Sequence, residues 1–169
     1  SLLARLSAER EKVIDLYGEI IKSSEKFEHY QRWEKGDISI FNSLWEVIEK
    51  EEENKFSEAR LILKKVLEKY PYFPFIYTRL GIFYQRINKH RKAIGAFQLA
   101  LGYTSFSKPQ ASICNLIGLS YFFLKEFNQA IIYFQYAIKL SPDISYYFNL
   151  AIVYYVIGRF DLARRYFEE

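Results

Sequence analysis

The sequence predicts an all-α fold, a right-handed solenoid of stacked antiparallel helix pairs with one extra long helix at the N-terminus. The first observation is an arrangement of small and aromatic residues that recurs at intervals near 34, around Gly81, Gly118 and Ala151. The second is an alanine twelve residues after each small residue, followed four residues later by a phenylalanine. A unit of this length predicts a helical hairpin, which buries its apolar face only by stacking on its neighbours.

The middle copy shows how the spacing specifies a hairpin. Gly118 has no side chain, and Ala130 has a small one, so the two predicted helices can approach closely at this point. Residues 124–128 form a turn of the length expected between antiparallel helices. Pro142 is expected to end the second helix after Leu140.

These residues resemble the tetratricopeptide repeat, a helix–turn–helix unit of 34 residues. The repeat from Ala111 matches its pattern, with Cys114 in place of the usual tryptophan, at Ile117, Gly118, Tyr121, Ala130, Phe134, Ala137 and Pro142. The repeat from Pro74, with Ser105 in place of the proline, matches at Tyr77, Leu80, Gly81, Tyr84, Ala93, Phe97 and Ala100. The last repeat, with alanine in place of the glycine, matches at Tyr147, Leu150, Ala151, Tyr154, Ala163 and Phe167.

A degenerate copy precedes these three. Ala59 lies 34 residues before Ala93, but the preceding helix, near 38–53, carries Glu46 and Val47 where leucine and glycine are expected. The repeat domain is therefore predicted at 37–169, with repeats at about 40–73, 74–110, 111–143 and an incomplete 144–169. The interval from Ala93 to Ala130 is longer, at 37 residues, which predicts an extended loop over 102–109 with Ser107 capping the next helix.

Residues 1–36 are predicted to form one long helix. Leu6, Val13, Ile20 and Phe27 are spaced by seven residues, as in a partial heptad. Two interpretations remain open: the helix packs on the first repeat as a cap, or it extends as a coiled-coil stem that joins two copies.

Composition and charge limit the function classes. Half of the residues are apolar and 19% are aromatic, which excludes intrinsic disorder. Residues 71–169 carry 11 Lys and Arg against 5 Asp and Glu, but their densest basic run, 86–92, is a single cluster rather than the stripe that nucleic acid would require. The apolar run 146–158 is too short to insert across a membrane. The absence of methionine and the first residue, Ser1, suggest a piece of a longer protein.

Residues suited to catalysis are scarce. The sequence has no P-loop and no glycine-rich dinucleotide motif. Its two histidines, His29 and His90, and its one cysteine, Cys114, lie far apart in the predicted fold and offer no metal-ligand cluster. We therefore expect no enzyme activity, no cofactor and no metal, and a buried thiol at Cys114.

The resemblance implies a binding site on the concave face, which in this family is lined by the first helix of each repeat. The lysine and asparagine clamp of chaperone adaptors is missing, and the lining is apolar and aromatic instead. The residues expected to contact a partner are Phe75, Thr78, Arg79, Ile82, Arg86, Asn115, Leu119, Phe122, Phe123, Phe148, Asn149, Ile152 and Tyr155.

The sequence thus predicts a non-enzymatic scaffold that binds a helix or apolar peptide of a partner protein within a larger assembly factor. The first alternative is a self-associating structural scaffold of a bacterial envelope or motility apparatus, joined through the N-terminal helix or the unfinished last repeat. The second is a regulatory domain of a larger protein. Nothing in the residues indicates the cellular compartment.

Overall fold

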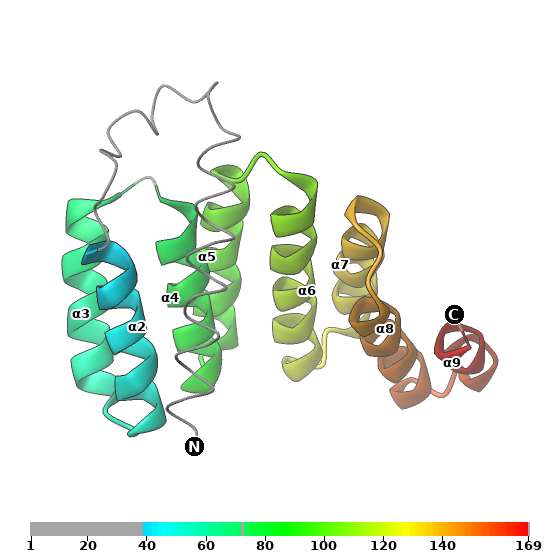
Figure 1. Ribbon diagram of the computed structural model, residues 1–169. Helices are drawn as coiled ribbons and strands as arrows, with labels where there is room; N and C mark the ends of the chain where they lie inside the picture. Colours follow the sequence, from blue (N-terminus) through cyan, green and yellow to red (C-terminus); the bar gives the residue numbers. More distant parts are fainter. Residues whose placement is uncertain (1–38, 72, 169) are drawn as a thin grey trace, which may run out of the picture. The chain divides into compact units, whose positions relative to one another are not determined.

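The structure, a computed structural model, describes residues 39–71 and 73–168, and the predicted helix at 1–36 lies outside them. All regular structure in the described residues is helical (Figure 1). The helices are α2 (Ser39–Glu52), α3 (Phe56–Lys69), α4 (Pro74–Arg86), α5 (His90–Gly102), α6 (Ser107–Phe123), α7 (Phe127–Leu140), α8 (Ile144–Val156) and α9 (Phe160–Phe167). The predicted all-α fold is confirmed.

The described residues fall into two compact units, with a boundary between residues 72 and 73. The first holds the hairpin α2–α3, which corresponds to the predicted degenerate repeat. Its buried apolar side chains recur every three or four residues along each helix, which places them on one helical face: Ile40, Leu44, Val47, Ala59, Leu63 and Val66. Val47, which stands where the pattern expects glycine, is fully buried.

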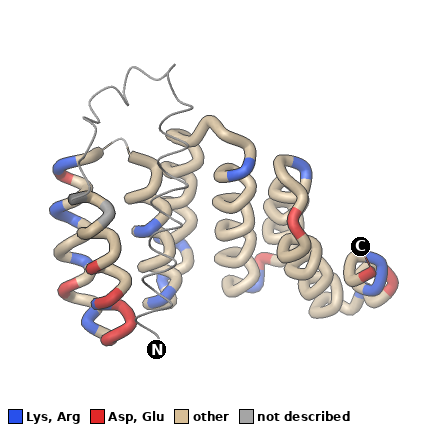
Figure 2. Tube along the Cα trace, in the orientation of Figure 1, with Lys and Arg blue, Asp and Glu red and all other residues tan. Residues whose placement is uncertain are grey.

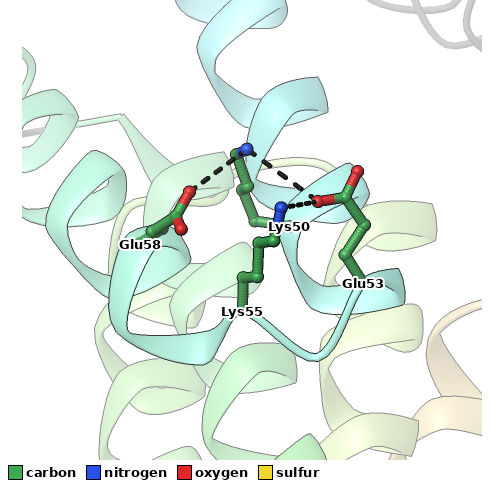
Figure 3. Close-up of polar contacts among 4 residues, drawn as sticks. All are labelled: Lys50, Glu53, Lys55 and Glu58. Carbon is green, nitrogen blue, oxygen red and sulfur yellow. Dashed lines mark ion pairs between the residues drawn. The ribbon is translucent and has the colours of Figure 1, made fainter.

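Ion pairs connect α2 to α3 and link two residues of the turn between them (Figure 3). Lys50 Nζ lies 3.1 Å from Glu58 Oε2, and Lys55 Nζ lies 2.8 Å from Glu53 Oε2. The pair with Lys55 holds the pKa of the Glu53 carboxyl below its ordinary value. Glu53, Lys55 and Glu58 are exposed and Lys50 is half-buried, so these pairs contribute little to stability.

The second unit holds the three hairpins α4–α5, α6–α7 and α8–α9. Each helix packs against the next along the chain, and α6 also contacts both α4 and α8, so the first helices of the hairpins lie side by side. Two clusters form most of the core: one is centred on Phe97 and Ile117, and the other on Phe134, Leu150 and Val153. This arrangement places the predicted binding residues on three neighbouring helices.

All four hairpins turn in the same way. One residue in each turn adopts the left-handed conformation, with φ of 58° at Asn54 and Asn88, 62° at Lys125 and 80° at Gly158. The backbone N–H of the following residue then donates to a carbonyl one turn back, as from Lys89 to Tyr84 at 2.8 Å. The degenerate hairpin α2–α3 therefore shares its turn geometry with the three clear copies.

The glycines of the first helices α4 and α6 allow an aromatic ring to enter the hairpins α4–α5 and α6–α7. A Cβ atom at Gly81 would lie 2.3 Å from Cε1 of Phe97, and one at Gly118 would lie 2.7 Å from Cε1 of Phe134. Both rings are buried, with exposed fractions of 0% and 1%. In the last hairpin the equivalent residue is Ala151, which has a Cβ atom, and the equivalent ring, Phe167, is 50% exposed.

The loop predicted over 102–109 is shorter in the structure, and the prediction that Ser107 caps the next helix was wrong. Helix α5 continues to Gly102 and α6 begins at Ser107, with Phe106 as the N-cap residue and no side-chain capping bond. The extra residues of the long interval lengthen α6 to 17 residues, against 13 in α4. Pro109 fits in the first turn of α6 because the N–H it lacks would have no helical acceptor there.

Candidate functional site

The predicted binding residues lie on α4, α6 and α8, and the exposed large apolar residues among them are Phe148 and Tyr155 on α8 and Phe123 at the end of α6. Phe148 and Tyr155 on α8 are 53% and 61% exposed, and Val156 beside them is 49% exposed. The predicted residues of α4 other than Arg86, and those of α6 other than Phe123, are half-buried. The part of the surface best able to receive an apolar partner is therefore α8.

The predicted binding residues of α4 expose less apolar area than those of α8. Thr78 Oγ1 donates to the carbonyl of Pro74 at 3.1 Å, within its own helix. Ile82 packs against the cluster of Phe97 and Ile117. Phe75 is half-buried, with its ring 5.2 Å from that of Phe73. Apart from the cations described below, this helix contributes mainly to the fold.

Two cations lie at the α4 end of the surface. Arg79 is half-buried in the middle of α4, and Arg86 is exposed in its last turn. The basic residue in the last turn also suits the negative end of the helix dipole. These cations give this end of the first-helix surface a positive charge that α8 lacks, since α8 contains no Lys or Arg.

Side-chain amides join the three first helices. Gln85 Nε2 on α4 donates to the carbonyl of Leu116 at 3.0 Å and to the hydroxyl of the buried Ser120 at 2.8 Å, both on α6. Asn149 Nδ2 on α8 donates to Asn115 Oδ1 on α6 at 2.8 Å. The two asparagines expected to bond a partner thus bond each other.

Sequence reasoning did not assign this bridging role to Gln85. The signal available was an amide late in one first helix and a small hydroxyl at the matching depth of the next. A buried hydroxyl needs a hydrogen-bond partner, and the amide supplies it. Such bridges fix the spacing of the first helices, and therefore the shape of the surface that they present.

Leu119 and Phe122 on α6 have a partly structural role. Both pack against the cluster of Phe134, Leu150 and Val153. The Phe122 ring also meets Phe127 edge-on, at 5.8 Å between ring centroids. Ile152 on α8 is half-buried. These side chains form a floor beside the more exposed aromatics of α8.

Two aromatic rings, at the first and last residues of α9, extend this surface. Phe148 meets Phe167 edge-on, with 5.6 Å between their centroids. Tyr155 meets Phe160 in the same manner at 5.3 Å. Phe160 and Phe167 are 61% and 50% exposed, so each pair leaves apolar area open. Sequence reasoning missed both partners because their positions predict burial or a turn.

Phe123 lies at the turn end of α6, where its ring meets that of Phe122 edge-on, with 5.8 Å between centroids. Its ring is 62% exposed and stacks on His90 at the start of α5, with 5.0 Å between centroids. Arg91 beside it pairs with Glu126 in the next turn. Burial lowers the pKa of His90, whose Nδ1 is buried without a hydrogen-bond partner among the described residues. The structure therefore groups Phe123 with the hairpin turns rather than with α8.

The described residues show no grouping suited to metal binding, since no three His, Cys, Asp or Glu side chains gather there. Cys114 is buried, as expected, and burial raises the pKa of its thiol. Within the same residues, no helix combines the length and the apolar character needed to cross a membrane.

Comparison with known proteins gives the repeat its name. The sequence model of the tetratricopeptide repeat matches residues 111–144, which span α6, α7 and the loop to α8. Residues 111–144 are a tetratricopeptide repeat. The resemblance predicted from the spacing of Gly118, Ala130 and Phe134 is confirmed. Four of the predicted binding residues lie in this repeat: Asn115, Leu119, Phe122 and Phe123.

Solved structures share the arrangement of tetratricopeptide repeat helices. A chain of the APC/C hetero-tetramer Cut9–Hcn1 is 23% identical over 75% of this protein, with a TM-score of 0.67, but this protein spans only 25% of that chain. MamA is 21% identical, with a TM-score of 0.67 over 97% of this chain and 88% of its own. The first repeat domain of Spaghetti (RPAP3), bound to the HSP90 peptide SRMEEVD, is 18% identical with a TM-score of 0.62 over 70% of this chain and 93% of its own.

Identities this low establish the fold alone. No curated protein sequence matches this chain significantly. The comparisons therefore support a tetratricopeptide-type solenoid, a fold that is typically a non-enzymatic protein-interaction scaffold.

Proposed function

We propose that this protein is a non-catalytic scaffold that binds an amphipathic helix or apolar peptide segment of a partner along α6 and α8, within a larger assembly. The observation that carries the proposal is the exposure of Phe148 and Tyr155 on a first helix, at 53% and 61%. Large aromatics with rigid rings bury much area at little cost in conformational entropy, and they commonly dominate binding energy.

The neighbouring residues suit an apolar segment rather than an acidic peptide end. Leu119, Phe122 and Ile152 form an apolar floor, and α8 contains no charged side chain. A helix presenting apolar residues at three- and four-residue spacing could cover Phe148 and Tyr155 together. The Spaghetti domain binds the peptide SRMEEVD, in which three of seven residues are acidic, and we expect a different ligand chemistry here.

The direction of the partner follows from charge. Arg79 and Arg86 on α4 give one end of the surface a positive charge, and we expect the acidic end of the partner segment to lie there. Such contacts would mainly steer the encounter and set the orientation, while the aromatics of α8 would supply affinity.

The test uses two matched double variants of the full chain. Phe148→Ala/Tyr155→Ala removes the exposed aromatics of α8. Leu99→Ala/Tyr136→Ala removes side chains of similar exposure, 51% and 54%, from the second helices α5 and α7. Partners captured by the wild-type chain from native lysate are identified, and the binding segment of each is then titrated as a purified peptide.

We expect the first variant to bind the peptide at least about tenfold more weakly, and the second to bind like wild type. Equal affinities for wild type and the α8 variant would refute the proposal. Light scattering of the purified chain identifies the case in which the partner is a second copy of the protein.

A further inference from the structure

The binding proposal leaves the hairpin turns of the second unit unexplained. We define the turn edge as residues 86–92, 123–127 and 156–161. Its three segments lie at the same end of the hairpins α4–α5, α6–α7 and α8–α9 (Figure 1). The stacking of His90 on Phe123 and the ion pair of Arg91 with Glu126 hold the first two segments together.

The turn edge exposes large apolar side chains. Phe123 and Phe160 are 62% and 61% exposed, and Val156 and Ile157 are 49% and 39% exposed. The turn geometry does not require them, because the hairpin α2–α3 makes the same turn with exposed polar residues over 52–55. The apolar residues therefore call for a functional explanation.

The turn edge is also basic. Its two acidic residues, Glu126 and Asp161, are each paired with an arginine of the edge. The cations of the edge are Arg86, Lys89, Arg91, Lys92, Lys125 and Arg159, which leaves a net charge of +4. Figure 2 shows Lys and Arg at the turn ends of α4–α5 and α6–α7. An anionic surface complements this charge.

We propose that the turn edge binds the surface of a membrane that contains anionic phospholipids. Apolar side chains at protruding turns can enter the boundary between headgroups and acyl chains without a complementary pocket, and the flanking cations attract the headgroups. This attachment is peripheral and needs no membrane-crossing helix.

The residues favour lipid over nucleic acid. Both ligands would attract the cations, but nucleic acid uses aromatic rings for stacking and has no comparable use for exposed aliphatic side chains. Val156 and Ile157 are aliphatic and stand beside Phe160 in one turn. The turn edge borders the peptide surface of α8 at Val156 and Phe160. Ile157 and the lysines of the turns belong to the turn edge alone, so the charge reversal at Lys89 and Lys125 tests this proposal separately from the peptide surface.

The test measures co-sedimentation of the full chain with vesicles of phosphatidylcholine, alone or mixed with phosphatidylserine, over a series of salt concentrations. Lys89→Glu/Lys125→Glu reverses two exposed charges of the edge, and Lys64→Glu/Lys65→Glu reverses two exposed charges on α3 as the control. Ile157→Ser/Phe160→Ser removes apolar contacts, and Leu99→Ser/Ile132→Ser, at 51% and 42% exposure, is the matched control. Circular dichroism verifies that each variant is folded.

We expect binding to the mixed vesicles only, weakened on the order of twentyfold or more by the charge reversal at the edge, because each cation near an anionic membrane contributes on the order of fivefold to affinity. We also expect a loss of at least about tenfold with Ile157→Ser/Phe160→Ser, and neither loss in the two controls. Failure of the wild type to bind the mixed vesicles, or losses as large in the controls, would overturn the proposal. Unchanged vesicle binding by Ile157→Ser/Phe160→Ser, together with equal affinity of the wild type for a DNA duplex, would indicate general attraction to polyanions and would overturn it too.

Discussion

The hairpins α6–α7 and α8–α9 have the same turn and the same alanine–phenylalanine spacing, yet they place their phenylalanines differently. Phe134 of α6–α7 is 1% exposed, whereas Phe167 of α8–α9 is 50% exposed. The ring of Phe134 occupies the space where a Cβ atom at residue 118 would lie, 2.7 Å from its Cε1. The equivalent residue in α8–α9 is Ala151, which carries a Cβ atom and is fully buried.

We infer from this comparison that one methyl group separates a structural copy of the repeat from a proposed binding copy. A ring excluded from the hairpin remains near the surface, and Phe167 lies against Phe148, the aromatic residue on α8 that we assign to the partner. Neighbouring exposed apolar side chains of this kind commonly mark an interaction site. The departure from the repeat pattern therefore falls where the proposed function needs it.

The largest expected effect on stability comes from substitutions in the hairpins that bury their phenylalanine. Gly81→Ala and Gly118→Ala each place a Cβ atom within 3 Å of a buried ring, and the ring has no open space to move into. We expect each substitution to lower the free energy of unfolding by about 1–3 kcal/mol, measured by urea denaturation. Gly81→Ala should destabilise the protein more than Gly118→Ala, because its Cβ atom would lie only 2.3 Å from Cε1 of Phe97.

Gly95→Ala is the control, since a Cβ atom there meets nothing within 4 Å and the residue is exposed in the middle of α5. It should raise the free energy of unfolding by about 0.5–1 kcal/mol through helix propensity. If all three alanines raised stability alike, the close ring contacts would be wrong.

The repeat pattern predicted most of this fold because its residues are those at which two helices pack closely. Gly118, Ala130 and Phe134 recur at fixed spacing because a ring enters between two helices at a place where no Cβ fits. The same pattern could not predict where α6 begins. Pro109 is tolerated in the first turn, so Ser107 is the first residue of the helix rather than its cap.

The candidate site was harder to predict than the fold. The position of a residue in a first helix gives its face, but not what it contacts in the neighbouring repeat. Asn115 and Asn149 bond each other, and Phe123 stacks on His90. These contacts depend on how adjacent hairpins are rotated against each other, which the spacing within one repeat does not specify.

The second prediction sharpens the comparison by converting the last hairpin into a structural copy. Ala151→Gly removes the methyl group to which we attribute the exclusion of the Phe167 ring. We expect the ring to move inward, which would appear as nuclear Overhauser effects between ring protons of Phe167 and the backbone of residue 151. Burial of the ring outweighs the helix-propensity cost of glycine, so stability should rise by about 1 kcal/mol.

The same variant should bind a partner of α8 more weakly, because Phe167 no longer supports Phe148. Ala163→Gly is the control, since it removes a methyl group from another buried residue of the same hairpin and therefore carries the propensity and cavity costs of glycine. A ring that stayed exposed in the Ala151→Gly variant would show that the methyl group is not what excludes it.

The smallest expected effect concerns the turns, where the two hairpins differ again. The left-handed residue is Lys125 in α6–α7, with φ of 62°, and Gly158 in α8–α9, with φ of 80°. A side chain disfavours this conformation and glycine does not. Lys125→Gly should therefore stabilise the protein by about 0.5–1 kcal/mol, and Gly158→Ala should destabilise it by about the same amount, in thermal or urea unfolding. Lys125→Ala separates conformation from charge, because it removes the ammonium group but keeps the Cβ atom. If Lys125→Ala matched Lys125→Gly, the gain would come from the lost charge, and the difference between the two turns would not be one of backbone strain.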